Sequence, residues 1–257
     1  MKNYGLVSII TPSWNCGEFV EETIKSVLAQ TYTNWELLFQ DDCSSDDTRA
    51  IVMRYAASDS RIQYACNAQN SGAAVTRNNA LHRAKGRWIA FLDSDDIWLP
   101  TKLEEQLKFM TENNYAFSYT NYTEIDEQSN YLGRVITGPR HINKIGMYAY
   151  CWPGCLTVMY NLTEVGLIQI ADIHKNNDYA MWLKVIKHAD CYLLRKTLAK
   201  YRKRVGSISH HSYAHLIRWH YRLFRDAQQL SAILSILLTM VNIIGGIIKK
   251  LHYVNHE

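Results

Sequence analysis

Polar and acidic residues stand directly after three short apolar runs in the first hundred residues. Residues 11–14 follow the first run, residues 41–42 follow the second, and residues 93–96 follow the last one. Two carboxylates separated by one residue on a turn can face one divalent cation, and their hard oxygens favour magnesium or manganese over zinc. Asp93 and Asp95 therefore predict a cation that neutralises phosphate charge, although an ordinary acidic turn has the same pattern.

Five other side chains have both a chemical and a structural interpretation. Trp14 suits stacking on a nucleotide base, but an isolated tryptophan there is more often part of a core. Asp42 suits a hydrogen bond to a base or ribose, whereas helix N-capping is the simpler role for the nearby Asp46. Arg77 is either an anion-binding cation or a solvated one. Asp178 opens a helix, where the helix dipole favours a carboxylate whether or not it is a general base.

Short apolar runs and helical patterns alternate along the first half of the chain. The runs cover residues 6–10, 35–39, 62–66 and 88–92, and apolar residues at helical spacing lie between them, as in the alanine-rich stretch at about 73–84. This alternation predicts βαβ units and a mainly parallel sheet in an α/β fold. Ligands of such sheets bind beyond the carboxyl ends of the strands, where the three polar clusters lie.

Composition narrows the class of protein. The chain has 257 residues, of which 47% are hydrophobic and 20% charged, with a formal charge of +4. These values exclude intrinsic disorder and indicate one large domain or two small ones. Nine basic residues and no acidic one lie between Arg195 and Arg225. Such a block favours an anionic partner, which can be phospholipid, a diphosphate or nucleic acid.

Several alternative chemistries lack their sequence signature. The six cysteines form no CxxC pair, so we expect reduced thiols and neither disulfides nor zinc. The sequence has no phosphate-binding loop, dinucleotide fingerprint, zinc-protease motif or nucleophile elbow. We also find no secretory signal pattern near the first residues.

The end of the chain has a different composition. Residues 227–248 carry no charged side chain and are numerous enough for one membrane span. Serine, threonine, asparagine and a pair of glycines interrupt this stretch, and basic residues stand at both ends. The sequence therefore leaves two interpretations, a helix in or on a membrane and a helix packed against the domain or a second copy.

Taken together, six motifs in this order and spacing resemble the family 2 glycosyltransferases over about residues 5–210. The motifs are Val7-Ser-Ile-Ile-Thr-Pro-Ser-Trp-Asn15, Gln40-Asp-Asp-Cys-Ser-Ser-Asp46, Asn70-Ser-Gly-x4-Arg-Asn78, Phe91-Leu-Asp-Ser-Asp-Asp96, Asn177-Asp-Tyr-x2-Trp-Leu183 and Tyr201-Arg-x4-Ser-Ile-Ser209. The resemblance implies the GT-A fold, with a nucleotide-binding half at about 1–98, an acceptor half at about 99–220 and a membrane-associating tail at 221–257.

The resemblance also implies a set of donor-site residues. Thr11 and Pro12 match the turn that holds the nucleoside, and Trp14 stands where the family usually has a tyrosine stacked on uracil. The remaining matches are Asp42 for the base, Arg77 for the ribose and diphosphate, Asp93 and Ser94 for the nucleotide sugar, and Asp95, with Asp93, for Mn²⁺ or Mg²⁺.

For catalysis, the resemblance implies an inverting transfer with Asp178 as the general base. Asn177 departs from the family, which usually has Glu before this aspartate. Losing that negative charge is expected to leave the pKa of Asp178 lower than in a Glu-Asp pair. The processive members' Gln-x-x-Arg-Trp motif is absent, which favours transfer of a single sugar.

The acceptor side is less defined. Trp152 and Trp182, with the segment 151–156, fall where such enzymes contact the acceptor sugar. His210 is a further candidate contact that could touch phosphate or ligate a metal, although a surface histidine beside the basic block has the same pattern. Members of this size commonly extend a sugar on a polyprenyl diphosphate during O-antigen or capsule assembly at the cytoplasmic face of the inner membrane. The resemblance thus implies a UDP-sugar donor, a lipid-linked GlcNAc or GalNAc acceptor, a membrane surface that meets the nine cations, and no nucleic acid. The alternative is a non-catalytic protein that binds a nucleotide sugar or glycan.

Overall fold

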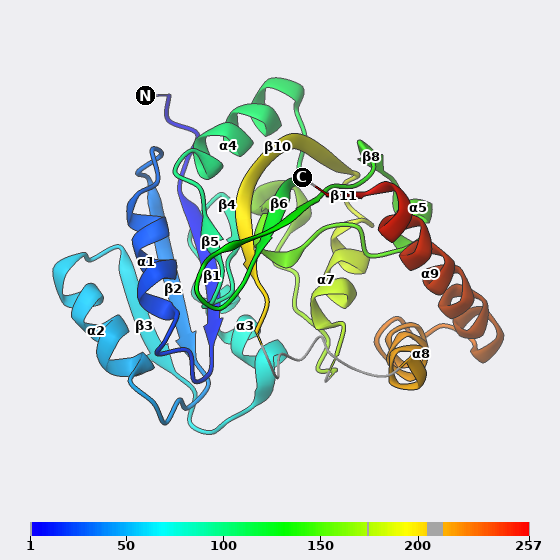
Figure 1. Ribbon diagram of the computed structural model, residues 1–257, viewed down its shortest axis with the longest axis horizontal. Coiled ribbons are helices and arrows are strands. Elements are labelled where there is room, and N and C mark those ends of the chain that lie inside the picture. Colours follow the sequence, from blue (N-terminus) through cyan, green and yellow to red (C-terminus); the bar gives the residue numbers. More distant parts are fainter. Residues whose placement is uncertain (1, 174, 205–212, 257) are drawn as a thin grey trace.

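The computed structural model has one mixed sheet with helices packed around it (Figure 1). It describes the chain except residues 1, 174, 205–212 and 257. The strands are β1 (Val7–Ser13), β2 (Trp35–Asp41), β3 (Ile62–Cys66), β4 (Trp88–Phe91), β5 (Ile97–Trp98), β6 (Phe117–Ile125), β7 (Tyr131–Ile136), β8 (His141–Ile142), β9 (Met159–Asn161), β10 (Cys191–Arg202) and β11 (Val254–His256). The helices are α1 (Val20–Leu28), α2 (Thr48–Ser58), α3 (Gly72–His82), α4 (Lys102–Asn113), α5 (Lys144–Ala149), η1 (Cys155–Thr157), α6 (Leu162–Val165), α7 (Asn177–Val185), α8 (Tyr213–Arg222), η2 (Leu223–Ala227) and α9 (Ala232–His252).

The first half of the chain forms the parallel part of the sheet. Strands β3, β2, β1 and β4 lie in this order, and every neighbouring pair is parallel. Strands β1 and β2 are buried along their whole length, as expected of apolar runs covered on both faces. The predicted alternation of strand and helix is therefore confirmed. The parallel arrangement brings the carboxyl ends of β1, β2 and β4 to one edge.

The second half extends the same sheet with mostly antiparallel strands. Strand β9 pairs antiparallel with both β4 and β6, and β6 continues through β7 to β11. The long strand β10 runs parallel to β6 and also pairs with β5. The acceptor half expected at 99–220 thus shares the sheet of the nucleotide-binding half.

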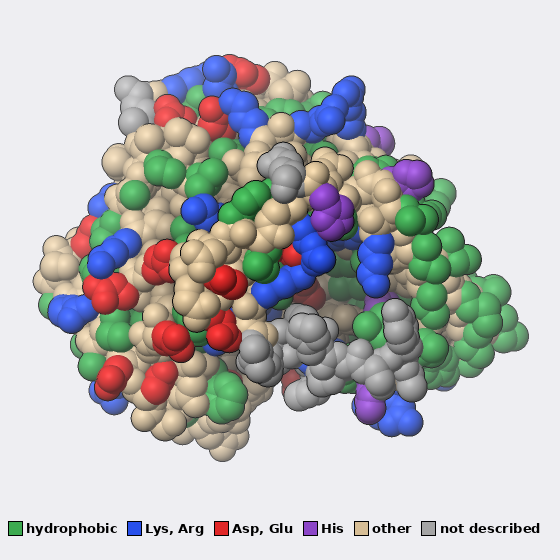
Figure 2. Space-filling view, in the orientation of Figure 1, with side chains coloured by type: hydrophobic (Ala, Val, Ile, Leu, Met, Phe, Trp, Pro, Cys, Tyr) green, Lys and Arg blue, Asp and Glu red, His purple; other side chains and the backbone are tan. Residues whose placement is uncertain are grey.

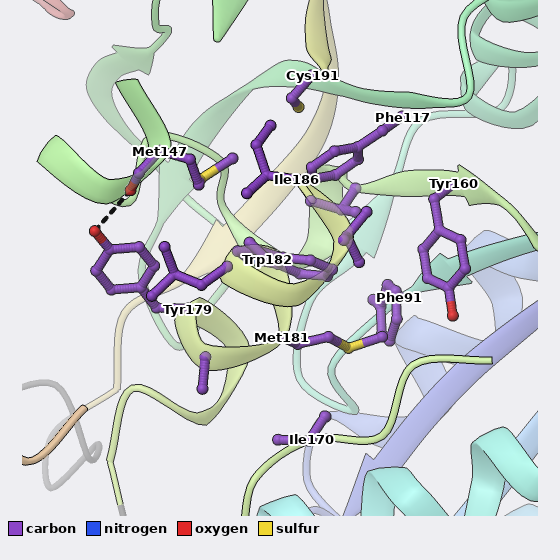
Figure 3. Close-up of a cluster of buried hydrophobic side chains, with 14 of the residues drawn as sticks. Phe91, Phe117, Met147, Tyr160, Ile170, Tyr179, Met181, Trp182, Ile186 and Cys191 are labelled. Atoms are coloured by element: carbon purple, nitrogen blue, oxygen red, sulfur yellow. Dashed lines mark hydrogen bonds between the residues drawn. The ribbon is translucent and has the colours of Figure 1, made fainter. Parts of the chain in front are cut away.

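A buried cluster surrounds helix α7 and fixes its position against the sheet (Figure 3). Trp182 lies in the middle of this cluster, with its ring edge-on to Phe91 at a centroid distance of 5.1 Å. The Tyr179 hydroxyl donates a hydrogen bond to the Met147 carbonyl at 2.7 Å, which attaches α7 to α5. Because Asp178 begins the same helix, this packing determines where its carboxylate lies.

The last segment returns to the sheet after a long apolar helix. Helix α8 leads through η2 to α9, and β11 then pairs antiparallel with β7. Among the described residues, one helix is long and apolar enough to cross a membrane, and this helix is α9. Helix α9 nevertheless packs along the domain beside α5 (Figure 1). All six cysteines are free thiols.

Candidate active site

The predicted donor-site residues gather at the carboxyl edge of the parallel strands. Ser13 and Asp41 are paired across β1 and β2. Just beyond β1, the Trp14 side chain is 57% exposed, so its indole face is open to a ligand. Thr11 and Pro12 are buried within β1, and Thr11 Oγ1 has no hydrogen-bond partner among the described residues. These two residues therefore lie inside the sheet, close in sequence to the exposed tryptophan.

Asp42 connects three segments at this edge. Its Oδ1 accepts hydrogen bonds from Asn67 Nδ2 at 2.7 Å and from the Ser71 amide at 2.8 Å. Its Oδ2 accepts one from the Gly72 amide at 2.8 Å, where α3 begins. Each carboxylate oxygen has more than one acceptor site, so Oδ2 retains capacity for a ligand. The carboxylate therefore caps α3, a role that the sequence analysis considered only for the nearby Asp46.

Arg77 is buried between the turn after β4 and the start of α7. Its Nη2 donates to Asp93 Oδ1 at 2.5 Å, and its Nη1 donates to Asn177 Oδ1 at 2.8 Å. Nearby carboxylates, with Asp93 foremost, outweigh the effect of burial and raise the pKa of Arg77, so it stays charged. Arg77 Nε has no hydrogen-bond partner in the described part of the chain. Arg77 thus links α3, the turn after β4 and the start of α7.

The acidic turn after β4 also contacts the segment after β1 and the end of β10. Asp95 forms an ion pair with Arg204 at 2.7 Å, and Ser94 Oγ is buried against Cys16 Sγ at 2.9 Å. Asp96 Oδ1 accepts from the Arg202 amide at 2.8 Å. Burial raises the pKa values of Asp95 and Asp96, and neighbouring carboxylates of the turn add to this effect.

This acidic turn fits a divalent cation in one respect. Asp96 Oδ2 has no hydrogen-bond partner within the described residues, and the turn carries three carboxylates, those of Asp93, Asp95 and Asp96. Among the same residues, no three His, Cys, Asp or Glu side chains gather around one point. Asp93 and Asp95 would therefore hold a cation together with oxygens of the ligand.

Arg202 holds the acidic turn in position through its buried side chain. The sequence analysis did not single it out as a site residue. Its side chain is 1% exposed and forms an ion pair with Glu22. It also donates to the carbonyl of Asp95 at 2.8 Å and to that of Asp126 at 3.1 Å. The signal in the sequence was its place in the Tyr201-Arg202 motif. The guanidinium holds the backbone of the acidic turn against α1 and the β6–β7 hairpin.

Asp178 occupies the first turn of α7, as predicted, and is half-buried. Its Oδ1 accepts a hydrogen bond from the Tyr179 amide at 2.8 Å. Burial raises the pKa of the Asp178 carboxyl above its ordinary value, and the charge of Arg77 partly lowers it again. A raised pKa makes a carboxylate a stronger base near neutral pH. The basicity of Asp178 therefore follows from its burial. Asn177 is an uncharged hydrogen-bond partner of Arg77.

The predicted acceptor contacts do not gather at this site. Trp182 has no exposed surface, so its predicted contact with an acceptor sugar is wrong (Figure 3). Trp152 is 9% exposed, and its indole N–H donates to the Gly146 carbonyl at 3.1 Å, which makes it part of the core as well. Both are apolar positions in the packing around α7. His210 lies outside the described residues.

The basic block is not one continuous anion-binding surface. Four of its nine cations form ion pairs with carboxylates of the same chain: Lys196 with Glu105, Arg202 with Glu22, Lys203 with Glu124, and Arg204 with Asp95. These pairs arise because the first part of the block is strand β10 and the residues just after it, packed against acidic neighbours. The expectation that all nine cations meet a membrane is therefore wrong.

A cavity of about 440 Å³ adjoins the start of α7. It lies between the segment before α7 and α8, where the rings of Tyr179 and His220 are 6.5 Å apart. The cavity is lined by Asp172, Ile173, Lys175, Trp219, Arg222 and Asp226. Lys175 Nζ lies 4.9 Å from the centre of the Trp219 ring. No motif marks these residues, since they are adjacent only in the folded chain.

Comparison with known sequences agrees with this arrangement. The model of the family described as glycosyl transferase family 2 matches residues 8–161. WfgD of Escherichia coli, a UDP-Glc:alpha-D-GlcNAc-diphosphoundecaprenol beta-1,3-glucosyltransferase, is 43% identical over 215 residues, covering 83% of each chain. TuaG of Bacillus subtilis (strain 168), named for teichuronic acid biosynthesis, is 43% identical over 205 residues, covering 79% of this chain and 81% of TuaG.

Comparison with solved structures supports the fold. Residues 1–349 of S. aureus TarS in complex with UDP-GlcNAc superimpose with a TM-score of 0.69 at 20% identity, covering 91% of this chain and 70% of that one. The mannosyltransferase PcManGT from Pyrobaculum calidifontis, in complex with GDP-Man and Mn²⁺, gives a TM-score of 0.66 at 17% identity, with 92% and 69% covered. The GT-A architecture expected from the motifs is thus confirmed.

Proposed function

The chain belongs to glycosyl transferase family 2, and we propose that it transfers one hexose from a UDP-sugar to a lipid-linked saccharide. The hexose is glucose, galactose or an N-acetyl form of either. The acceptor is GlcNAc or GalNAc on a polyprenyl diphosphate, during synthesis of a bacterial O-antigen or capsule. The donor and acceptor in the name of WfgD support this assignment, and the name of TuaG supports a role in surface polysaccharide.

The observation that carries the proposal is the half-buried Asp178 carboxylate beside the Arg77–Asp93 pair. In the proposed inverting reaction, Asp178 takes the proton of an acceptor hydroxyl. That oxygen attacks C1 of the donor sugar from the face opposite the nucleotide. The bond between C1 and the phosphate oxygen breaks, and UDP leaves with the electron pair.

On the donor side, Trp14 stacks on uracil and Asp42 uses its remaining acceptor capacity for the base. Arg77 supplies fixed positive charge near the diphosphate, which requires no rearrangement as negative charge develops there. Asp93 and Asp95 would hold Mn²⁺ or Mg²⁺, which polarises the diphosphate and stabilises it as a leaving group.

On the acceptor side, the cavity before α7 binds the acceptor, because the two tryptophans predicted for this role are buried. Trp219 offers an aromatic face to a sugar ring, and Asp172, Lys175 and Arg222 offer charged partners for hydroxyls and phosphate. The segment 221–257 brings this cavity to the cytoplasmic face of the inner membrane, where a polyprenyl diphosphate is found.

The test compares Asp178→Asn with Asp47→Asn, a control at the exposed N-cap of α2. Hexose transfer to a synthetic GlcNAc-diphosphate-lipid is measured by mass spectrometry, with and without EDTA, and UDP-sugar binding by calorimetry. We expect Asp178→Asn to lose at least about 100-fold in transfer rate, with donor affinity unchanged. Full transfer by this variant would remove Asp178 as the base. UDP-sugar binding without transfer by the parent chain would favour the non-catalytic alternative.

A further inference from the structure

Helix α9 has its polar side turned toward the domain and its apolar side turned outward. Ser235, Thr239 and Asn242 are at most 4% exposed, and Gly245 is buried in the same stripe. The outward residues are 37–75% exposed: Ile233, Leu234, Ile236, Leu237, Met240, Val241, Ile243, Ile244, Ile247, Ile248 and Leu251. Figure 2 shows the resulting apolar surface over α9, at the right edge of the molecule. A helix on a water-exposed surface has the opposite arrangement.

The polar stripe is closely fitted to the domain. Asn242 Nδ2 donates to the Tyr179 hydroxyl at 2.8 Å, and Tyr179 is the residue after Asp178. A Cβ atom at Gly245 would lie 2.7 Å from the Tyr150 Cβ, so only glycine allows this approach. Lys249 Nζ donates to the Trp152 carbonyl at 3.0 Å. The Asn242 contact attaches α9 to the helix that carries the proposed base, and the other two attach it to the segment after α5.

Both ends of α9 are held on the same body. Before the helix, the Leu230 amide donates to the Phe224 carbonyl at 3.1 Å. After it, the Thr137 amide donates to the Tyr253 carbonyl at 2.9 Å, and β11 pairs with β7. A spanning helix would place β11 and β7 on opposite sides of the bilayer and expose the polar stripe to lipid. The fold is therefore incompatible with a transmembrane α9.

We propose that α9 lies in the plane of an anionic lipid surface, with its apolar face between headgroups and acyl chains, and holds the base helix α7 at that surface. The inference rests on the proposed function, because a polyprenyl-linked acceptor reaches the enzyme from such a surface. The helix is about 31 Å long at 1.5 Å per residue, and it presents its apolar side along this whole length. The exposed Arg225 and Lys250 flank it and match the negative charge of the lipid.

The test uses vesicles of phosphatidylglycerol and phosphatidylethanolamine in a flotation assay. Leu237→Glu/Ile244→Glu places two carboxylates on the outward face, where both side chains are more than half exposed. Met53→Glu is the control for a carboxylate added away from α9, at an exposed apolar residue on α2. We expect the double variant to float at least tenfold less than the parent, and the control to float like the parent.

Activity separates this inference from the proposed function. With a short-chain, water-soluble acceptor, the double variant is expected to match the parent within twofold. With a polyprenyl acceptor in vesicles, it is expected to lose at least tenfold. Equal flotation of both variants would overturn the inference while leaving transfer intact. If the parent is a dimer that does not float, and Leu237→Glu/Ile244→Glu is a monomer, the apolar face is assigned to a second copy of the chain instead.

The in-plane orientation has its own readout. His256→Cys places a thiol in β11, and a membrane-impermeant maleimide is added to protein bound outside sealed vesicles. Labelling above the background of the parent chain is expected, because β11 stays on the outer side with the domain. Labelling that requires detergent would mean that α9 crosses the bilayer.

Discussion

The exchange Asn177→Glu restores the residue that the family usually has before the base. In the structure, Asn177 Oδ1 accepts a hydrogen bond from Arg77, whose charge lowers the pKa of Asp178 against the effect of burial. A glutamate at this position adds a negative charge beside Asp178 and competes for Arg77. Both changes raise the pKa of Asp178.

The size of the effect follows from Coulomb's law. Two carboxylates about 8 Å apart at an effective dielectric constant of about 20 repel each other by about 2 kcal/mol. One pH unit corresponds to about 1.4 kcal/mol, and solvent near the half-buried Asp178 weakens the interaction. We therefore expect a shift of roughly one pH unit in the pKa of Asp178.

The assay is the pH dependence of kcat/KM for Asn177→Glu and for Asn177→Gln, which has the same length without the charge. Asp178 acts as a base only when ionised, so activity falls as the pH drops through its pKa. A higher pKa moves this loss to higher pH. On the acidic limb, the Glu variant is expected to be about tenfold less active than the Gln variant. Superimposed acidic limbs would refute the assigned coupling among Asn177, Arg77 and Asp178.

Two further predictions concern buried charges. Asp95→Ala is expected to abolish manganese-dependent UDP binding in calorimetry, because it removes one of the two proposed cation ligands, and unchanged affinity with manganese would contradict that role. Lys102 is fully buried over the Trp98 ring, and burial lowers its pKa far below the ordinary value. Lys102→Met is expected to raise Tm by several degrees, and more so at lower pH, because only the unfolded lysine gains a proton there. Scanning calorimetry at two pH values that shows equal or lower Tm would contradict this account.

The parallel half of the fold was predictable from local pattern. Each strand from β1 to β4 is an apolar run that stops at polar or small residues, and helical spacing lies between the runs. Parallel strands connected by helices have few arrangements, so the position of the three polar clusters at one edge followed. The predicted ends differed by a few residues, since β1 continues to Ser13.

The second half was less predictable because its pairings are distant in sequence. Strand β10 contains several charged residues and pairs with β6, more than 60 residues earlier, so no local alternation marks it. Strand β9 has only three residues, and its partners on both sides determine its identity as a strand. Trp182 was assigned to the acceptor from the resemblance, and the sequence could not correct this because it does not show on which side of a helix a tryptophan is covered.

The motifs predicted the location of the candidate site residues better than the partners of their side chains. Asp42, Arg77 and Asp95 lie at the predicted edge, and each contacts a residue that is distant in the sequence. Asp42 binds the amides at the start of α3, and Asp95 binds Arg204. Hydrogen-bond partners depend on side-chain direction after folding, whereas motif spacing records only the order of the elements.

The charges at the site are balanced by residues that come together only in the completed sheet. Asp93 is paired with Arg77 from α3, Asp95 with Arg204 after β10, and Asp96 with the Arg202 amide at the end of β10. Strand β10 is therefore needed to hold the acidic turn as well as to extend the sheet. Because α7 and α9 pack through the Tyr179–Asn242 hydrogen bond, the same framework links the acidic turn, Asp178 and the apolar face of α9. A change that loosens β10 is thus expected to disturb donor binding and the base together.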